Sequence, residues 1–355
     1  MKIITSVLSF TIFFGAFSQS DTTNNVLQGT ALVDSVAESQ RIYNEGISAL
    51  EKNSFDEAIG HFTTSLSYNS KFSKNYYNRG LAYKELKLYN KALEDFIIYT
   101  QEGENKDAAY YEMYKIKLEQ NEEGAANEFL EQAMLNNPSQ PKYPYERGVK
   151  RFQSGDYDGA IADFNTAIAA DKNYAYAYND RGSAKMQKGQ VEGAIEDYRM
   201  AILSNKSLPF AYNNLGTALR KAGKFQEAID NYSKAIMLDE KYYIAYNNRG
   251  LAKFENKKYE DAIKDFNECI LLSPNYAFAF NNRASAYLKL EKYKETEKDC
   301  SKAIELDPSY GYAYFNRGIA REMLRKIEDA CTDWRKAAEL GIKSAETYYN
   351  SVCND

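Results

Sequence analysis

The feature that most constrains this chain is a repeat of 34 residues that runs through nearly all of it. Small residues recur at this step at Gly182, Gly216, Gly250, Ala284 and Gly318. Counting back by the same step reaches Gly148, Tyr114, Gly80 and Gly46, so one frame holds for nine repeats from 39 to 344 without an insertion or deletion. A fixed period of this length is typical of stacked supersecondary units.

Each repeat has the pattern of two helices, which we call helix A and helix B. Twelve positions after the small residue there is usually an alanine, and four positions later usually an aromatic residue, as with Gly250, Ala262 and Phe266. Spacings of three and four residues put side chains on one face of a helix. A glycine inside a helix costs about 1 kcal/mol relative to alanine, so its recurrence indicates a close approach of A to B. We therefore expect an all-α solenoid of stacked helix pairs.

Segments such as YNNLGTAL and YNNRGLAK, followed by the alanine and aromatic positions of helix B, resemble the tetratricopeptide repeat family. The closing proline of that family is kept only as Pro138, Pro274 and Pro308. The resemblance covers 39–355 and implies a right-handed superhelix whose A helices line a concave surface. Residues 345–355 begin a tenth frame and then stop, which predicts a capping helix.

The third repeat departs from the pattern. Tyr114 replaces the small residue, which predicts a clash with a helix packed closely against Ala126. Pro138, Pro141 and Pro144 follow, and proline disrupts helix interiors. We expect a kink or looser joint around 135–145 that divides the repeats of 39–140 from those of 141–344. The alternative is a diverged repeat with normal stacking.

The N-terminal residues have the pattern of a secretory signal peptide. Lys2 precedes an apolar run over 3–17 that is short for a membrane span, and Ala16 and Ser18 predict cleavage before Gln19. An uncleaved anchor is the alternative. We expect a signal peptide at 1–18, a polar linker at 19–38 and a mature chain without an integral membrane segment, periplasmic or secreted.

Arginine and aspartate occur together across the repeats. Six repeats carry Arg just before the small residue and Asp sixteen positions later, and the three repeats that lack the Arg also lack the Asp. The pairs are Arg79 and Asp95, Arg147 and Asp163, Arg181 and Asp197, Arg249 and Asp265, Arg283 and Asp299, and Arg317 and Asp333. This covariation predicts a bidentate bridge between A and B of one repeat. Ligand binding by these arginines is the alternative.

The sixth position of helix A is polar in every repeat. It holds Asn44, Asn78, Asn214, Asn248, Asn282 and Asn316, with acids at Glu112, Glu146 and Asp180. This row resembles the asparagine ladder inside the O-GlcNAc transferase repeats, and its amides could bond the backbone of an extended peptide. The acids favour a basic stretch of the partner. The alternative is a solvated asparagine copied by duplication.

An apolar stripe at the second position of helix A lies beside this row, at Tyr176, Phe210, Ile244, Phe278 and Tyr312. If these side chains are exposed they would mark an interaction surface. They could equally pack between neighbouring A helices.

Four cysteines occur, and none has a CxxC spacing. Buried thiols are the ordinary expectation, but an exported chain could form disulfides. The bridge that we favour joins Cys331 to Cys353, because the cap should pack on the last helix B.

Composition and motifs argue against catalysis. The net charge of −5 leaves no basic surface for nucleic acid, and the single histidine, His61, disfavours a His-based metal site or a Ser/His triad. We expect no enzyme, cofactor or metal, and an exported scaffold that binds protein or peptide segments in a groove of A helices. The alternative is a structural assembly factor of a cell-envelope or secretion complex that uses its convex face or ends. Partner and oligomeric state stay open.

Overall fold

A computed structural model describes residues 26–353, with side chains from residue 34 onward. The expected signal peptide, 1–18, and the first part of the expected linker lie outside the described residues. The second part of that linker is helical, because α1 (Val26–Glu51) begins well before residue 39. Residues 26–38 include leucine, glutamine, alanine and glutamate, which favour helices, and no proline. The expectation of a linker rested on the small and polar residues among them.

The described residues form helices and no strand, which confirms the all-α prediction. After α1 come α2 (Phe55–Tyr68), α3 (Ser73–Glu85), α4 (Tyr89–Glu102), α5 (Lys106–Glu119), α6 (Glu123–Asn136), α7 (Lys142–Gln153), α8 (Tyr157–Ala170), α9 (Ala175–Gln187), α10 (Val191–Ser204), α11 (Pro209–Lys221), α12 (Phe225–Leu238), α13 (Tyr243–Glu255), α14 (Tyr259–Leu272), α15 (Ala277–Lys289), α16 (Tyr293–Leu306), α17 (Gly311–Met323), α18 (Ile327–Glu339) and α19 (Lys343–Val352). Odd numbers up to α17 are A helices, even numbers are B helices, and α19 follows the last pair.

The chain divides into two compact units. The N-terminal unit ends at Arg147 and the C-terminal unit begins at Gly148, so the boundary falls inside α7 and a little beyond the division expected between 140 and 141. Pro144 lies in the first turn of α7, where proline is tolerated. The looser joint around 135–145 stays a prediction.

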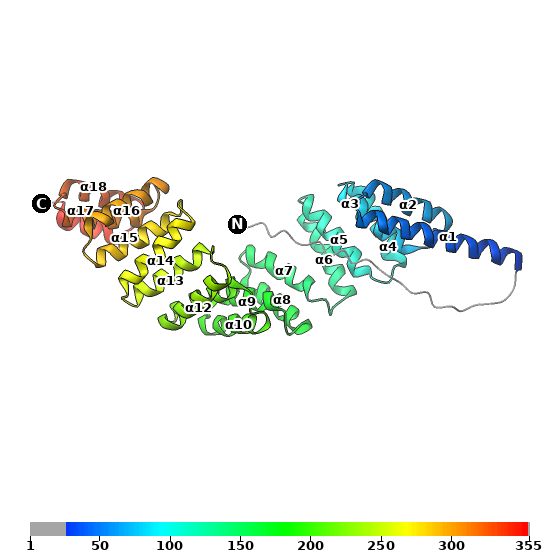
Figure 1. Ribbon diagram of the computed structural model, residues 1–355, viewed down its shortest axis with the longest axis horizontal. Coiled ribbons are helices and arrows are strands. Elements are labelled where there is room, and N and C mark those ends of the chain that lie inside the picture. The colour runs from blue at the N-terminus through cyan, green and yellow to red at the C-terminus, as the bar shows by residue number, and fades with distance from the viewer. Residues whose placement is uncertain (1–25, 354–355) are drawn as a thin grey trace. The chain divides into compact units, whose positions relative to one another are not determined.

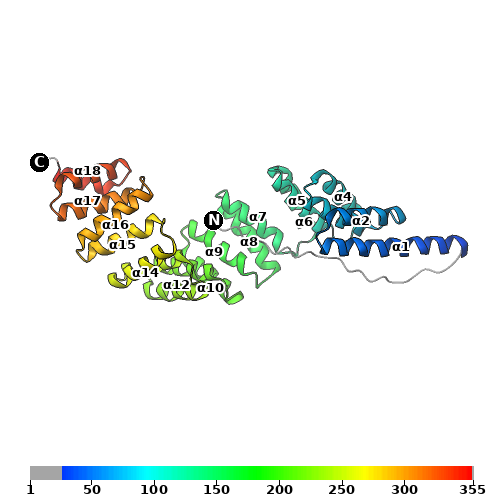
Figure 2. The same ribbon diagram turned by 45° about the horizontal axis from the view of Figure 1, so that its top comes forward.

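Within each unit the helices pack in chain order (Figures 1 and 2). Helix A packs on helix B of its own repeat, as α9 does on α10, and helix B packs on the next helix A, as α10 does on α11. Consecutive A helices also touch, as α11 and α13 do, whereas no two consecutive B helices in the described part of either unit make comparable contact. The A helices are therefore closer together than the B helices, which puts them on the inner side of the stack.

The recurrent glycine allows an aromatic ring to fill the space between A and B. Phe266 of α14 is fully buried, and a Cβ added at Gly250 of α13 would lie 2.6 Å from its Cε1 atom. The same relation joins Gly216 of α11 to Tyr232 of α12, with 2.8 Å to Cε1. Any larger residue at these positions would have to displace a buried ring, which explains why the small residue recurs.

The third repeat accommodates Tyr114 without the predicted clash. Tyr114 is buried in one apolar cluster with Ala126 and Leu130, and α5 packs against α6 as in the other pairs. Leu130 stands where most repeats carry an aromatic ring. A smaller side chain on helix B therefore makes room for a larger one on helix A, and the prediction of a clash was wrong.

Helix α19 covers the end of the array. It packs on α18 over a cluster that contains the fully buried Trp334 and Ala337, with Tyr349 and Val352 partly buried against them. Of the helices that the structure describes, none combines the length and the apolar character needed to cross a membrane.

Candidate functional site

Five predicted Arg–Asp pairs join A to B within a repeat by two parallel hydrogen bonds. In each, arginine Nε donates to Oδ2 and Nη2 donates to Oδ1 of a buried aspartate, over 2.5–2.9 Å. The pairs are Arg79 with Asp95, Arg181 with Asp197, Arg249 with Asp265, Arg283 with Asp299, and Arg317 with Asp333. Arg147 and Asp163 lie on the two sides of the unit boundary, and their pairing stays a prediction.

Sequence reasoning missed a second cation at several of these aspartates. Lys253 Nζ lies 2.8 Å from Asp265 Oδ2, and Lys185 and Arg321 approach Asp197 and Asp333 in the same way. Each of these cations stands four positions after the paired arginine, one helical turn further along helix A, and that spacing was the available signal.

Asp95 has no such second cation from helix A of its own repeat. The residue one turn after Arg79 is Tyr83. Burial raises the pKa of Asp95, and the hydrogen bonds and charge of Arg79 only partly offset that effect. Arg79 alone thus compensates the buried carboxylate incompletely.

The arginines are also bound to the preceding repeat. Arg249 Nη1 donates to Ser233 Oγ of α12 over 3.0 Å. Within α13 itself, the guanidinium carbon of Arg249 lies 5.5 Å from the centre of the Tyr246 ring. Arg283 donates in the same way to Asn267 of α14 over 2.7 Å. Because several donors of each arginine are engaged inside the protein, the geometry favours the structural interpretation over ligand binding.

The asparagine row of the C-terminal unit is linked from repeat to repeat. Each row amide donates from Nδ2 to the Oδ1 atom of a buried asparagine one position earlier in the frame, on the preceding helix A. The four bonds run from Asn214 to Asn179 (3.1 Å), Asn248 to Asn213 (3.0 Å), Asn282 to Asn247 (2.9 Å) and Asn316 to Asn281 (2.9 Å). Sequence reasoning missed the buried partners, although the Asn–Asn doublets contained them.

Bonds within the doublets extend the row into a continuous chain. Asn179 donates to Asp180 over 2.9 Å, and Asn213 and Asn247 donate to their following row amides over 3.4 Å. Side-chain amides thus connect Asp180 to Asn282 along the A helices. We call this set the amide chain. Its row members are partly exposed, while the earlier asparagines of the doublets are buried.

Asn78 of the N-terminal unit does not belong to an accessible row. It is 2% exposed, and its amide donates to Tyr43 Oη over 2.8 Å and to the Lys74 carbonyl over 3.1 Å. With the group buried and its donors used, Asn78 cannot contact a partner, so its assignment to a peptide site was wrong. The cause is Tyr43, whose hydroxyl reaches over from the preceding helix A.

The apolar stripe of the C-terminal unit is exposed at three of its five positions. Tyr176, Phe278 and Tyr312 are 43%, 48% and 58% exposed, whereas Phe210 and Ile244 are partly buried. Tyr176 and Phe210 stack with ring centres 5.9 Å apart, which links neighbouring repeats. Both interpretations of the stripe therefore hold in part, because the rings contact neighbouring repeats and still leave apolar surface exposed.

Glu112 is not available to a basic partner. Its two carboxylate oxygens are each paired with a lysine, Lys84 at 2.6 Å and Lys115 at 2.5 Å. Although burial acts against the charge, the two lysines hold the pKa of Glu112 below its usual range. The expectation that this acid favours a basic stretch was wrong, because sequence could not show that two cations already face it.

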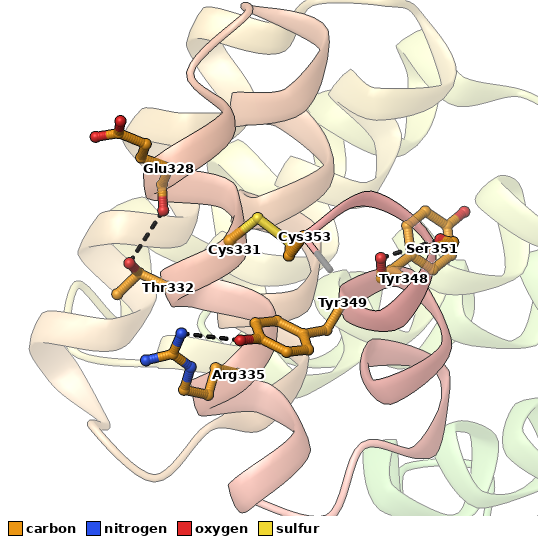
Figure 3. The surroundings of a disulfide bond; sticks show 8 residues. All are labelled: Glu328, Cys331, Thr332, Arg335, Tyr348, Tyr349, Ser351 and Cys353. Atoms are coloured by element: carbon orange, nitrogen blue, oxygen red, sulfur yellow. Dashed lines mark hydrogen bonds between the residues drawn. A yellow bond between two sulfur atoms is a disulfide. The ribbon is translucent and has the colours of Figure 1, made fainter. Parts of the chain in front are cut away.

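The structure contains the disulfide favoured by the sequence, between Cys331 of α18 and Cys353 just after α19. Figure 3 shows the bond beside Tyr349, whose hydroxyl accepts a hydrogen bond from Arg335 Nη2 over 2.9 Å. Cys269 and Cys300 are buried free thiols. Burial raises the pKa of Cys269 to about 12, which makes a reactive thiolate rare at neutral pH. Within the described ranges, no group of three or more His, Cys, Asp or Glu residues is placed to hold a metal ion.

Family models match the repeats directly. A model described as "Tetratricopeptide repeat" matches 209–242, 243–276 and 277–310, and a second model with the same description matches 73–97 and 175–207. A model described as "TPR repeat" matches 148–188. Together these matches cover just over half of the chain. No curated protein matches it.

Solved structures show the same architecture. The chain is similar to a tetratricopeptide repeat protein from Parabacteroides merdae, with 19% identity over 69% of this chain and 97% of that one and a TM-score of 0.55. It is similar to pilF of Pseudomonas aeruginosa, with 19% identity over 60% and 96% and a TM-score of 0.53. It is also similar to the APC/C hetero-tetramer Cut9–Hcn1, with 12% identity over 89% and 76% and a TM-score of 0.56. At these identities the likeness concerns the fold.

Proposed function

Because the chain belongs to the tetratricopeptide repeat family, we propose that it is a scaffold that binds extended segments of other proteins along the A helices of its C-terminal unit. The observation that carries this proposal is the amide chain, which places partly exposed polar groups at every repeat from Asp180 to Asn282. The role is protein interaction and not catalysis, in keeping with the family.

The amide chain is suited to a peptide backbone. An asparagine amide has two N–H donors and two acceptor lone pairs, and the bond between repeats uses one donor of each row amide, as in Asn248. That bond also fixes which way the amide faces. Each row amide can then offer its second N–H to a neighbouring backbone, together with the oxygen lone pair that the bonds within the doublets leave unused. Because every residue has the same backbone groups, such binding would depend little on partner sequence.

The exposed rings supply the apolar part of the proposed surface. Tyr176, Phe278 and Tyr312 lie on the same A helices as the amide chain or on the next one along. Aromatic side chains contribute large contact areas at interfaces. We infer that they pack against side chains of the bound segment while the amides hold its backbone.

Changing Asn214, Asn248 and Asn282 together to alanine should weaken peptide binding about a hundredfold, since a net hydrogen bond contributes about 1 kcal/mol. Binders would first be selected from a phage-displayed library of random linear peptides, and their Kd values measured by fluorescence anisotropy. The matched control changes Gln226 and Asn231 of α12 to alanine, which should leave binding intact. Equal affinities for the triple variant and the wild type, in proteins with equal melting temperatures, would refute the proposal.

We also propose that the chain is exported, which rests on residues 1–18 and is supported by the Cys331–Cys353 disulfide, since such bonds persist mainly in oxidising compartments. The protein isolated from its native host should begin at Gln19, as read by N-terminal sequencing, and should lie outside the cytoplasm on fractionation. An intact Met1 on a cytoplasmic protein would contradict export.

A further inference from the structure

A cavity lies within the N-terminal unit, apart from the amide chain. It has a volume of about 330 Å³. Its walls come from α3, from α5 with the loop before it, and from the loop that leads into α7 together with the first residues of α7. Three tyrosine rings line it, Tyr77, Tyr111 and Tyr143, so it combines aromatic walls with polar groups.

Two charged side chains in this wall have no ion-pair partner among the described residues. Lys142 makes no salt bridge there, and its Nζ atom lies 4.3 Å from the centre of the Tyr111 ring. Asp107 is likewise without a cation, and its Oδ2 atom accepts hydrogen bonds from Tyr143 Oη over 2.8 Å and from Asn137 Nδ2 over 3.0 Å. The two residues therefore present one positive and one negative charge to the same space without neutralising each other.

The remaining charges around the cavity argue against a ligand of a single sign. Lys84 and Lys115 share Glu112, and Glu146 accepts a hydrogen bond from Tyr111 Oη over 3.3 Å. Three lysines thus face three acids in this region. Any ligand with a net charge would meet a like charge at Lys142 or at Asp107, and an unpaired charge in a partly enclosed site is costly.

We propose that this cavity binds a small zwitterion, a free α-amino acid, whose carboxylate pairs with Lys142 and whose ammonium group pairs with Asp107. The volume accommodates a molecule of that size. Asn105 and Gln140 also line the cavity and supply further donors and acceptors. The tyrosine rings provide apolar surface for the amino-acid side chain.

The charges around Lys115 favour the binding of a carboxylate at this cavity. The pKa of Lys115 is lowered, chiefly by burial, and repulsion from Lys84 and Lys142 adds to that effect while the adjacent Glu112 opposes it. A carboxylate bound at Lys142 would relieve this repulsion. The cavity thus lies at the third repeat, which departs from the sequence pattern of the other repeats.

The test is isothermal titration calorimetry of the whole mature chain with each standard amino acid. At least one should bind, and its N-acetyl and carboxamide derivatives should bind at least about tenfold more weakly, because each lacks one of the two charges. Asp107→Asn, which keeps an oxygen for Tyr143, and Lys142→Gln should each weaken binding about tenfold or more. Glu104→Gln and Lys106→Gln remove nearby charges that do not line the cavity and should leave the Kd unchanged.

Three results would overturn the proposal. One is the absence of binding by any free amino acid at millimolar concentration. Another is equal binding of a derivative that is blocked at both ends, an N-acetyl amino-acid amide, which would assign the cavity to a peptide segment. The third is equal affinity in Asp107→Asn, Lys142→Gln and wild type. Peptides whose binding requires Asn214, Asn248 and Asn282 should bind Asp107→Asn normally, so this test is independent of the proposed scaffold function.

Discussion

Replacing Asp265 with alanine should destabilise the C-terminal unit by about 3–5 kcal/mol, the usual cost of removing one partner from a buried ion pair. The Asp265 side chain is only 4% exposed and accepts from Arg249 and from Lys253, which are 19% and 18% exposed. Its loss leaves two cations facing each other with little access to water. Urea unfolding followed by circular dichroism measures the change.

A double-mutant cycle separates the pair from its neighbours. Adding Arg249→Leu to Asp265→Ala should restore only part of the stability, because Lys253 remains unpaired. Asp299 pairs with Arg283 and with no second cation among the described residues, so Arg283→Leu should rescue Asp299→Ala more fully. Strict additivity of the arginine and aspartate changes in both repeats would contradict a stabilising pair.

Replacing Cys353 with serine should destabilise the C-terminal end of the array by about 3 kcal/mol. The disulfide closes a loop with a sequence separation of 22, and losing such a cross-link returns roughly that much chain entropy to the unfolded state. Because α19 packs chiefly on α18, we expect the loss of protection to be confined to these two helices. Hydrogen exchange read by mass spectrometry measures it.

A dithiol reductant provides the matched control for this prediction. It should reproduce the effect on the wild type and add nothing to Cys353→Ser, since that variant has no bond left to reduce. Equal exchange in α18 and α19 of the oxidised and reduced wild type would show that packing over Trp334 alone holds the cap.

The sequence predicted those parts of the fold that depend on local spacing. Helix pairs follow from side-chain spacings of three and four residues, and the approach of A to B follows from the recurrence of Gly250 and its equivalents. The nine repeats also acted as an alignment within one chain. Covariation among them identified the partners of Arg79 and Arg249 although sixteen residues separate each pair.

Predictions that depended on side chains of neighbouring helices were wrong at two positions. Asn78 and Asn248 occupy the same frame position, yet one is buried under Tyr43 and the other is partly exposed. Tyr114 was expected to clash, but Leu130 gives it room. In each case the outcome depends on the size of a side chain on another helix. The position of a residue within its repeat does not specify that side chain.

The amino-acid sequence by itself thus determined the repeat, the helix pairs and the Arg–Asp pairs within a repeat, because periodicity and covariation encode contacts that recur at a fixed offset. Only the tertiary structure decided that row asparagines bond to buried asparagines of the preceding repeat. It also decided that Lys142 and Asp107 line one cavity and form no ion pair with any described residue. The physical reason is that hydrogen bonding and charge pairing act over about 3–4 Å, and the stacking of helices sets those distances.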